Sequence, residues 1–107
     1  MKLRYTPESR ADLRAIRTYI SKALGNPDAA ERTVFRLLDA CADLKQFPRL
    51  GRALSGRIDR ETDLRYLVCG KHLVFYRIEQ ESVSVVRILD GRRDYLQMLF
   101  DAASDGG

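Results

Sequence analysis

The chain has 107 residues and a formal net charge of +4, and 45% of its residues are hydrophobic and 32% are charged. This balance is typical of a soluble globular protein, and the length predicts a single domain that buries a core of its own. The 15 acidic residues among 19 basic ones exclude the charge profile of a dedicated nucleic-acid binder, although they permit contact with phosphate.

The cysteine and histidine content argues against a metal site. One histidine and two cysteines, Cys41 and Cys69, are too few and too far apart in sequence for zinc. Unpaired cysteines of this kind are typical of a reducing compartment. The sequence has no apolar leader and no apolar run of membrane-spanning length. We therefore expect a cytoplasmic protein without a metal, a cofactor or a membrane partner.

The N-terminal half predicts a strand and then a first helix. Residues 2–5 alternate in polarity, as a half-buried strand does. Thr6 is a suitable cap and Pro7 a suitable first residue for a helix, which Gly25 ends. The apolar positions of this helix share one face and are Leu13, Ile16, Ile20 and Leu24.

A second helix follows after a tight turn. Asn26 and Pro27 repeat the signal for a helix start. The apolar stripe of this helix consists of Ala30, Val34, Leu37, Leu38, Cys41 and Leu44. The two stripes face each other if the chain reverses between the helices, which predicts an α-hairpin.

The C-terminal half has the texture of a sheet. Residues 47–63 are rich in arginine, with glycine and proline and no clean period, which predicts a loop that can include a short strand. Strand-like runs follow at residues 64–69, 72–78 and 82–89, and such close neighbours pair antiparallel. Residues 92–100 predict a short last helix.

The predicted order is β-α-α-β-β-β-α, with helices and strands in separate parts of the chain, which indicates an α+β fold. We expect an antiparallel sheet with the N-terminal α-hairpin packed on it, the first strand at its edge, and a short C-terminal helix. In this prediction residues 1–103 form a single domain and residues 104–107 form a flexible tail.

Cleavage of RNA requires a general base, a general acid and cations that stabilise the phosphorane. His72, at the start of a predicted strand, is the one side chain whose ordinary pKa suits proton transfer near neutral pH. Arg65 and Arg93 are candidate cations. A histidine in this position more often has no catalytic role, and the arginines have carboxylates nearby with which to pair.

The stretch RILDGRRDY, residues 87–95, places Arg87, Arg92, Arg93 and Tyr95 where the last strand ends. Arginine holds phosphate and carboxylate groups well, but it stays charged and is therefore a poor proton donor or acceptor. We interpret this stretch as a recognition or structural element rather than a catalytic one.

Several short motifs resemble, in order and spacing, the RelE/ParE toxin superfamily and within it the ParE-type toxins. The resemblance covers about residues 2–96. The motifs are Phe47-Pro48 with Gly51, Leu64-Arg65-Tyr66-Leu67, Phe75-Tyr76-Arg77-Ile78, Val86-Arg87-Ile88-Leu89 and Gly91-Arg92-Arg93-Asp94. The opening strand followed by Thr6-Pro7 and a helical hairpin fits the same family.

The resemblance implies the toxin of a type II toxin–antitoxin module, neutralised by a cognate ParD-like antitoxin. ParE-type members act on DNA gyrase and block replication, whereas RelE-type members cleave ribosome-bound mRNA. Leu73 falls where RelE-type members carry an important arginine, which argues against cleavage, and Asp90 stands where ParE-type chains often have histidine. We expect a gyrase inhibitor whose target- or antitoxin-binding residues are Arg87, Arg92, Arg93 and Tyr95.

Two alternatives stay open. One is a RelE-type endoribonuclease that cleaves mRNA on the ribosome through Arg65, His72 and Arg93, and the other is a non-toxic binding module of the same fold. In each case an amphipathic segment of a partly disordered antitoxin can fold into a groove between the hairpin and the sheet.

Overall fold

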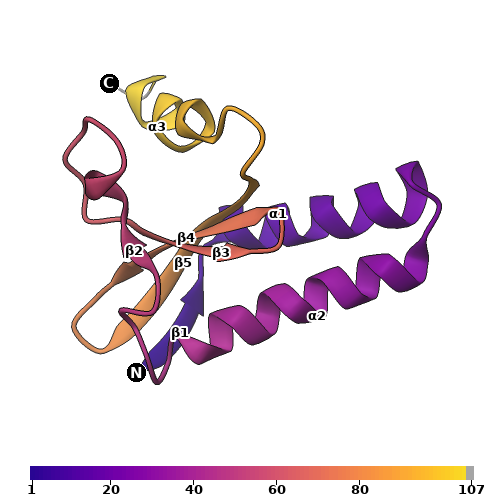
Figure 1. Cartoon of the computed structure of the whole chain (residues 1–107), viewed down its shortest axis with the longest axis horizontal. Coiled ribbons are helices and arrows are strands. Elements are labelled where there is room, and N and C mark those ends of the chain that lie inside the picture. The colour runs from indigo at the N-terminus through magenta and orange to yellow at the C-terminus, as the bar shows by residue number, and fades with distance from the viewer. Residues whose placement is uncertain (106–107) are drawn as a thin grey trace.

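Figure 1 shows the computed structural model, which describes residues 1–105 and the side chains of residues 1–100. The elements are, in chain order, β1 (Lys2–Tyr5), α1 (Pro7–Thr18), the π-helical turn η1 (Tyr19–Ala23), α2 (Pro27–Asp43), β2 (Arg52–Ala53), the 3₁₀ turn η2 (Leu54–Gly56), β3 (Arg65–Cys69), β4 (His72–Ile78), β5 (Ser82–Asp90) and α3 (Tyr95–Asp105). The tail predicted at residues 104–107 lies partly outside the described residues, and the domain limit at residue 103 stays a prediction.

The strands form one five-stranded sheet in the order β1-β5-β4-β3-β2. β3, β4 and β5 form the antiparallel meander that the sequence predicts, and β2 adds a short antiparallel strand from the predicted loop. β1 lies at the sheet edge, as expected, but it pairs with β5 in parallel. The helical hairpin between β1 and the meander provides the long crossover that parallel pairing requires. The α+β prediction is thus confirmed, with a sheet that is mostly antiparallel.

The capping residues predicted for the hairpin make the expected hydrogen bonds. Thr6 Oγ1 accepts a bond from Ser9 N–H at 3.1 Å, and Asn26 Oδ1 accepts one from Ala29 N–H at 3.1 Å. Each cap satisfies a backbone donor that the first turn of a helix leaves unpaired. The sequence signals for both helix starts are therefore confirmed.

The end of the first helix differs from the prediction in its last turn. Gly25, at φ +65°, ends it in the left-handed conformation, as expected. The chain first widens into η1, where Leu24 N–H donates to Tyr19 O at 3.0 Å. A π turn adds a residue and rotates the next side chains away from the apolar stripe. Leu24, predicted to be part of that stripe, is therefore 55% exposed.

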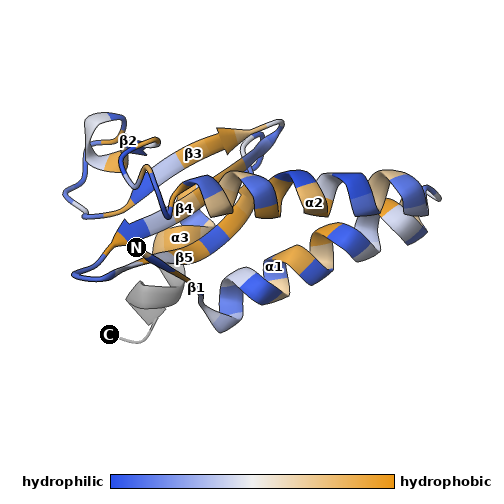
Figure 2. Cartoon of the chain, turned by 90° about the horizontal axis from the view of Figure 1, so that it is seen from below, coloured by the Kyte–Doolittle hydropathy of each residue, from blue (hydrophilic) through white to orange (hydrophobic). Residues whose placement is uncertain are grey.

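The helices cover opposite faces of the sheet. The hairpin packs on one face through a cluster that includes Leu37, Val74 and Ile88. α3 and the segment after β2 pack on the other face through a cluster that includes Phe75 and Leu89. Successive strand residues point to opposite faces, which explains why neighbours such as Val74 and Phe75 belong to different clusters. Figure 2 shows α1 and α2 side by side along the sheet. No helix in the described part of the chain is long and apolar enough to span a membrane.

A buried tyrosine on β4 holds the loop that precedes β2. Tyr76 Oη donates to Pro48 O at 2.7 Å and accepts a bond from Gly51 N–H at 3.0 Å. The side chain of Tyr76 is fully buried. A Cβ on Gly51 would lie 2.7 Å from Tyr76 Oη and would also collide with Tyr66 O, so only glycine fits there. The motif Phe47-Pro48 with Gly51 therefore has a structural role in this chain.

Candidate functional site

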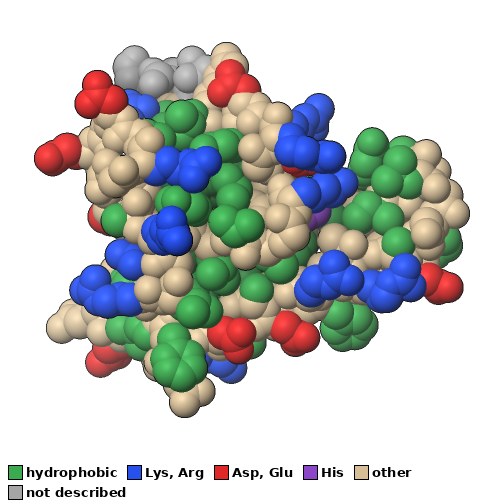
Figure 3. Space-filling model, in the orientation of Figure 1, with side chains coloured by type: hydrophobic (Ala, Val, Ile, Leu, Met, Phe, Trp, Pro, Cys, Tyr) green, Lys and Arg blue, Asp and Glu red, His purple; other side chains and the backbone are tan. Residues whose placement is uncertain are grey.

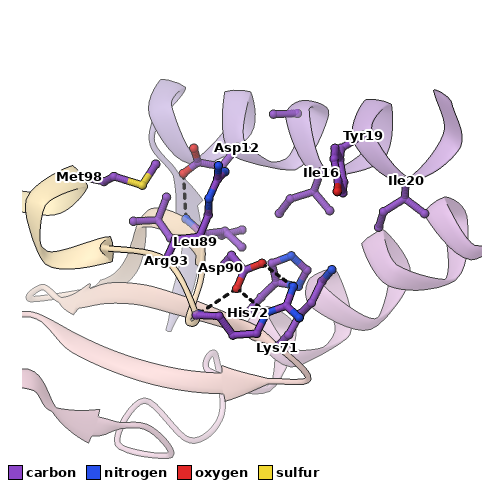
Figure 4. Close-up of a pocket in the computed structure, with 13 residues that line it drawn as sticks. Asp12, Ile16, Tyr19, Ile20, Lys71, His72, Leu89, Asp90, Arg93 and Met98 are labelled. Atoms are coloured by element: carbon purple, nitrogen blue, oxygen red, sulfur yellow. Dashed lines mark hydrogen bonds and ion pairs between the residues drawn. The ribbon is translucent and has the colours of Figure 1, made fainter. Parts of the chain in front are cut away.

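A groove of about 720 Å³ lies between α1, the carboxyl end of β5 and the segment that leads into α3. β1 ends at Tyr5, where the chain turns into α1, whereas β5 continues to Asp90. Within the described residues, the second half of β5 therefore has no strand on its α1 side. We call this hollow the α1–β5 groove; Figure 4 shows Ile16, Tyr19 and Ile20 on one side of it and Lys71, His72 and Asp90 on the other.

An ion pair closes one end of the α1–β5 groove. Arg87 Nε donates to Asp12 Oδ2 at 2.8 Å and Arg87 Nη2 donates to Asp12 Oδ1 at 3.0 Å. The backbone N–H of Ile88 donates to the same carboxylate at 2.9 Å, and Arg87 Nη1 donates to Met98 O at 3.3 Å. The side chains of Asp12 and Arg87 are only 13% and 22% exposed. These bonds join α1, β5 and α3, so Arg87 has a structural role; its predicted part in binding a partner stays a prediction.

The rim of the groove carries positive charge. Arg92 Nη2 lies 3.0 Å from Asp90 Oδ2, and the hydrogen bond from the Arg92 side chain lowers the pKa of Asp90 to about 2. This bond stabilises the fold above the ordinary carboxyl pKa, and the contribution is lost as the pH falls toward 2. Lys71 and Arg93 are exposed on the same rim and form no ion pair within the described residues.

His72 lies at the floor of the groove rather than on the open surface. It is 5% exposed, and the buried setting lowers its pKa, with Lys71 adding to the shift. Figure 3 shows the single histidine, in purple, deep between blue basic side chains and green hydrophobic ones. The neutral imidazole is therefore the form that the fold favours.

The burial of His72 predicts a pH dependence of stability. The unfolded chain takes up a proton near the ordinary imidazole pKa of 6.5, and the folded chain resists it. We expect the free energy of unfolding to fall as the pH drops below 6.5, and the His72→Leu variant to lose this slope. Urea unfolding at pH 8 and pH 5 measures the difference. Equal slopes in the two proteins would show that His72 titrates freely in the fold.

The structure separates the three residues of the ribonuclease hypothesis. Arg65 pairs across β3 and β4 with Tyr76, whereas His72 pairs with Cys69, four positions along β4, or about 13 Å away. Arg65 Nη2 donates to Gly51 O at 2.6 Å, and Arg65 Nε is buried without a hydrogen-bond partner among the residues that the structure describes. Arg65 therefore supports a loop at one end of the strand pair. His72 and Arg93 share the α1–β5 groove at the other end.

Tyr95 also lies apart from the groove. Its ring packs against Phe75 on the α3 face of the sheet, with the ring centroids 5.6 Å apart. Arg57 lies over the Tyr66 ring at 5.6 Å, and side-chain hydrogen bonds to Tyr66 and Tyr95 raise the pKa of Arg57. We call these three residues, Arg57, Tyr66 and Tyr95, the tyrosine cluster. Of the predicted binding residues, the structure thus brings Arg92 and Arg93 together and places Tyr95 elsewhere.

The sequence alone did not single out Asp12 or Arg57. Asp12 stands four residues before Ile16, on the side of α1 that faces the sheet, and a carboxylate at a buried helix position is a signal for a partner of opposite charge. Arg57 carries no comparable signal, because it lies in a loop whose sequence has no helical or strand periodicity.

Cys41 is buried and burial raises its pKa to about 11, which disfavours the thiolate. The described residues contain no group of three or more potential ligands placed to hold a metal ion.

Comparisons with known proteins assign the chain to a family. A family model described as the ParE toxin of the type II toxin–antitoxin system parDE matches residues 3–95. The chromosomal ParDE system from P. aeruginosa has a similar structure, with a TM-score of 0.69 and 22% identity over 84% of this chain and 95% of that chain. The RelBE2 toxin–antitoxin complex from Mycobacterium tuberculosis is similar with a TM-score of 0.60 and 22% identity, over 83% of this chain and 95% of that chain. No curated protein matches. The likenesses show a shared fold, and the family match over most of the length shows that this chain belongs to the ParE toxins of type II toxin–antitoxin systems.

Proposed function

We propose that this toxin inhibits DNA gyrase, blocks replication in that way, and is held silent by a cognate ParD-like antitoxin. The observation that carries the choice of gyrase over mRNA is the separation of Arg65 from His72 and Arg93. Membership of the ParE family supports the same choice.

RNA cleavage depends on groups that meet at one phosphate. A general base or acid must come within hydrogen-bond reach of the proton that it transfers. Arg65 lies about 13 Å along the strands from His72 and donates to backbone carbonyls, so it is engaged in the loop. Leu73 fills the position where the resemblance to RelE-type enzymes would require arginine. A toxin that acts by binding fits this geometry better than a nuclease.

The cationic corner of the groove is suited to recognition. Arg92 and Arg93 are exposed beside each other at the end of β5, and Lys71 lies on the same rim of the groove. Guanidinium groups bind carboxylates and phosphates with two parallel hydrogen bonds. Such a corner can contact an acidic surface of gyrase or the backbone of the DNA that gyrase holds. The antitoxin partner is supported by the two similar structures, each of which is a toxin–antitoxin system.

A reconstituted gyrase reaction tests the proposal. With purified gyrase and relaxed plasmid, we expect increasing toxin to reduce supercoiling and to raise the amount of cleaved DNA that detergent releases. The double variant Arg92→Glu/Arg93→Glu should need about tenfold more toxin for the same effect, since two charge-assisted contacts are lost. Arg32→Glu/Arg36→Glu, with two exposed arginines on α2, is the charge-matched control. Full gyrase activity at any excess of folded toxin would refute the proposal.

One observation favours the second candidate, cleavage of ribosome-bound mRNA. The tyrosine cluster places the exposed guanidinium of Arg57 beside two phenols on the α3 face of the sheet, where a phosphate could bind. Mapping of mRNA ends on translating ribosomes distinguishes this candidate. Ends that appear with wild-type toxin and disappear with Arg57→Ala would favour it over gyrase. If cells that express the toxin without its antitoxin grow normally, the result would favour the non-toxic binding module.

A further inference from the structure

We propose that the toxin associates with a second copy of itself through the outer surface of α2, with the two helices antiparallel about a two-fold axis. The surface concerned, which we call the α2 stripe, consists of Arg32, Phe35, Arg36, Leu38, Asp39 and Asp43. The inference rests on the order of the charges in the stripe and on its exposed apolar side chains. It does not depend on the target of the toxin.

The α2 stripe is the part of α2 that the fold leaves uncovered. The positions that pack on the sheet are buried and recur every three or four residues: Ala30, Val34, Leu37 and Cys41. All six residues of the stripe are exposed. Phe35 is 64% exposed and Leu38 is 36% exposed. These two side chains are neighbours on the helix surface, and adjacent exposed apolar groups mark a candidate contact surface.

The charges of the α2 stripe oppose the polarity of the helix. A helix is stabilised by acidic residues near its first turn and by basic residues near its last turn. In the stripe the basic pair, Arg32 and Arg36, precedes the acidic pair, Asp39 and Asp43, and the last turn of α2 has no basic residue. Each pair also places like charges four residues apart, which destabilises a helix on its own. These charges are therefore arranged against the stability of α2 alone.

The charged side chains of the α2 stripe are available to a partner. Within the described part of the chain, the ion pairs of α2 involve Glu31 but none of the four charged residues of the stripe. Figure 3 shows red and then blue side chains following one another along α2, at the lower edge of the view. The stripe therefore presents a basic half and an acidic half side by side.

A second copy of the chain matches this order of charges. The register that places Arg32 opposite Asp43 of the second copy also places Arg36 opposite Asp39, because both pairs are centred on the same point of α2. A two-fold axis through that point repeats both contacts. Parallel helices would instead bring like charges together. The pattern therefore selects the antiparallel arrangement, in which the two helix dipoles also attract each other.

The same register brings the apolar side chains of the stripe together. Phe35 then lies two residues, or about 3 Å along the helix axis, from the level of Leu38 of the second copy. Burial of these side chains supplies attraction, whereas exposed ion pairs contribute little energy each and chiefly fix the direction of the contact. A contact of this small size predicts a weak dimer that forms as the concentration rises.

Sedimentation of the purified full-length toxin tests the dimer with two charge variants. We expect the average mass of the wild type to rise from one chain toward two with increasing concentration. Arg32→Glu/Arg36→Glu makes the charges of the stripe all acidic, and Asp39→Lys/Asp43→Lys makes them all basic. Each variant alone should dimerise about tenfold more weakly than the wild type, since like charges then meet. An equal mixture of the two restores opposite charges at every contact and should form a mixed dimer at least as readily as the wild type. Circular dichroism checks that each variant is folded.

A matched pair of variants tests the apolar part of the contact. Phe35→Ser removes an exposed ring from the stripe. Val68→Ser removes an equally exposed side chain, at 62%, from the face of the sheet that carries Tyr66 and packs against α3. We expect the Kd of self-association to rise about tenfold in Phe35→Ser, because the ring occurs twice in a two-fold contact, and to stay unchanged in Val68→Ser.

The outcomes either support this surface or overturn it. A wild type that stays monomeric at every concentration would overturn the inference. A mixture of the charge variants that stays monomeric, while the wild type dimerises, would assign the dimer to another surface and overturn it as well. The same holds if the charge variants lose affinity for the antitoxin and the wild type is a monomer. The described lining of the α1–β5 groove includes no residue of the α2 stripe, so both charge variants should keep the effect on gyrase. Failure of the gyrase proposal would leave the dimer untouched.

Discussion

Replacing Gly51 by alanine is expected to lower the free energy of unfolding by about 3 kcal/mol, as overpacking of a dense site does. The added Cβ would lie 2.7 Å from Tyr76 Oη and would collide with the backbone oxygen of Tyr66. The backbone cannot retreat without cost, because Gly51 N–H donates to Tyr76 and Gly51 O accepts a bond from Arg65 at 2.6 Å. Urea unfolding of the purified variant measures the loss.

Gly56→Ala is the control for this substitution. No atom lies within 4 Å of a Cβ built on Gly56, and its backbone needs no special conformation. We expect its stability to differ from the wild type by no more than about 0.5 kcal/mol. If Gly51→Ala and Gly56→Ala are equally stable, the loop is not held in the way that the structure describes.

Removal of Asp12 is expected to have a comparable effect for an electrostatic reason. Asp12→Ala would leave Arg87 charged, mostly buried and without its partner, and would leave Ile88 N–H without an acceptor. Breaking a buried ion pair by removing one partner costs about 3 kcal/mol, and the partial exposure of Arg87 keeps the cost from rising further. Thermal or urea unfolding measures the change.

Two further variants show whether the unpaired charge is the cause. Asp12→Ala combined with Arg87→Met removes both charges, and we expect it to recover part of the lost stability. Asp39→Ala removes an exposed carboxylate from α2 and should stay within about 0.5 kcal/mol of the wild type. A double variant less stable than Asp12→Ala would show that Arg87 contributes chiefly through its other contacts.

Much of the fold follows from local signals in the sequence. Caps at Thr6 and Asn26 and a glycine at position 25 mark the helical hairpin. The apolar, β-branched runs that alternate with polar residues mark the strands of the meander. These signals are strong because each depends on a few neighbouring residues. The parallel pairing of β1 depends on a crossover of the whole hairpin and carries no local signal. The same is true of η1, whose extra residue moves Leu24 out of the apolar stripe.

The site was less predictable, because side chains far apart in sequence decide its chemistry. Nothing in the sequence distinguishes Arg65 and Arg87 from Arg93. In the structure the side chains of Arg65 and Arg87 form hydrogen bonds within the protein, whereas Arg93 is exposed. His72 at a strand start gives no sign that the fold will bury it. The α1–β5 groove exists because β5 extends beyond the end of β1, and only the register of the two strands shows this.

One experiment on growing cells tests the central claim that this toxin acts on gyrase rather than on mRNA. After brief expression without the antitoxin, gyrase-linked DNA breaks and new mRNA ends are mapped in the same culture. The account predicts that gyrase-linked breaks accumulate, that mRNA ends stay unchanged, and that Arg92→Glu/Arg93→Glu reduces the breaks. New mRNA ends within reading frames, without an increase in gyrase-linked breaks, would contradict it.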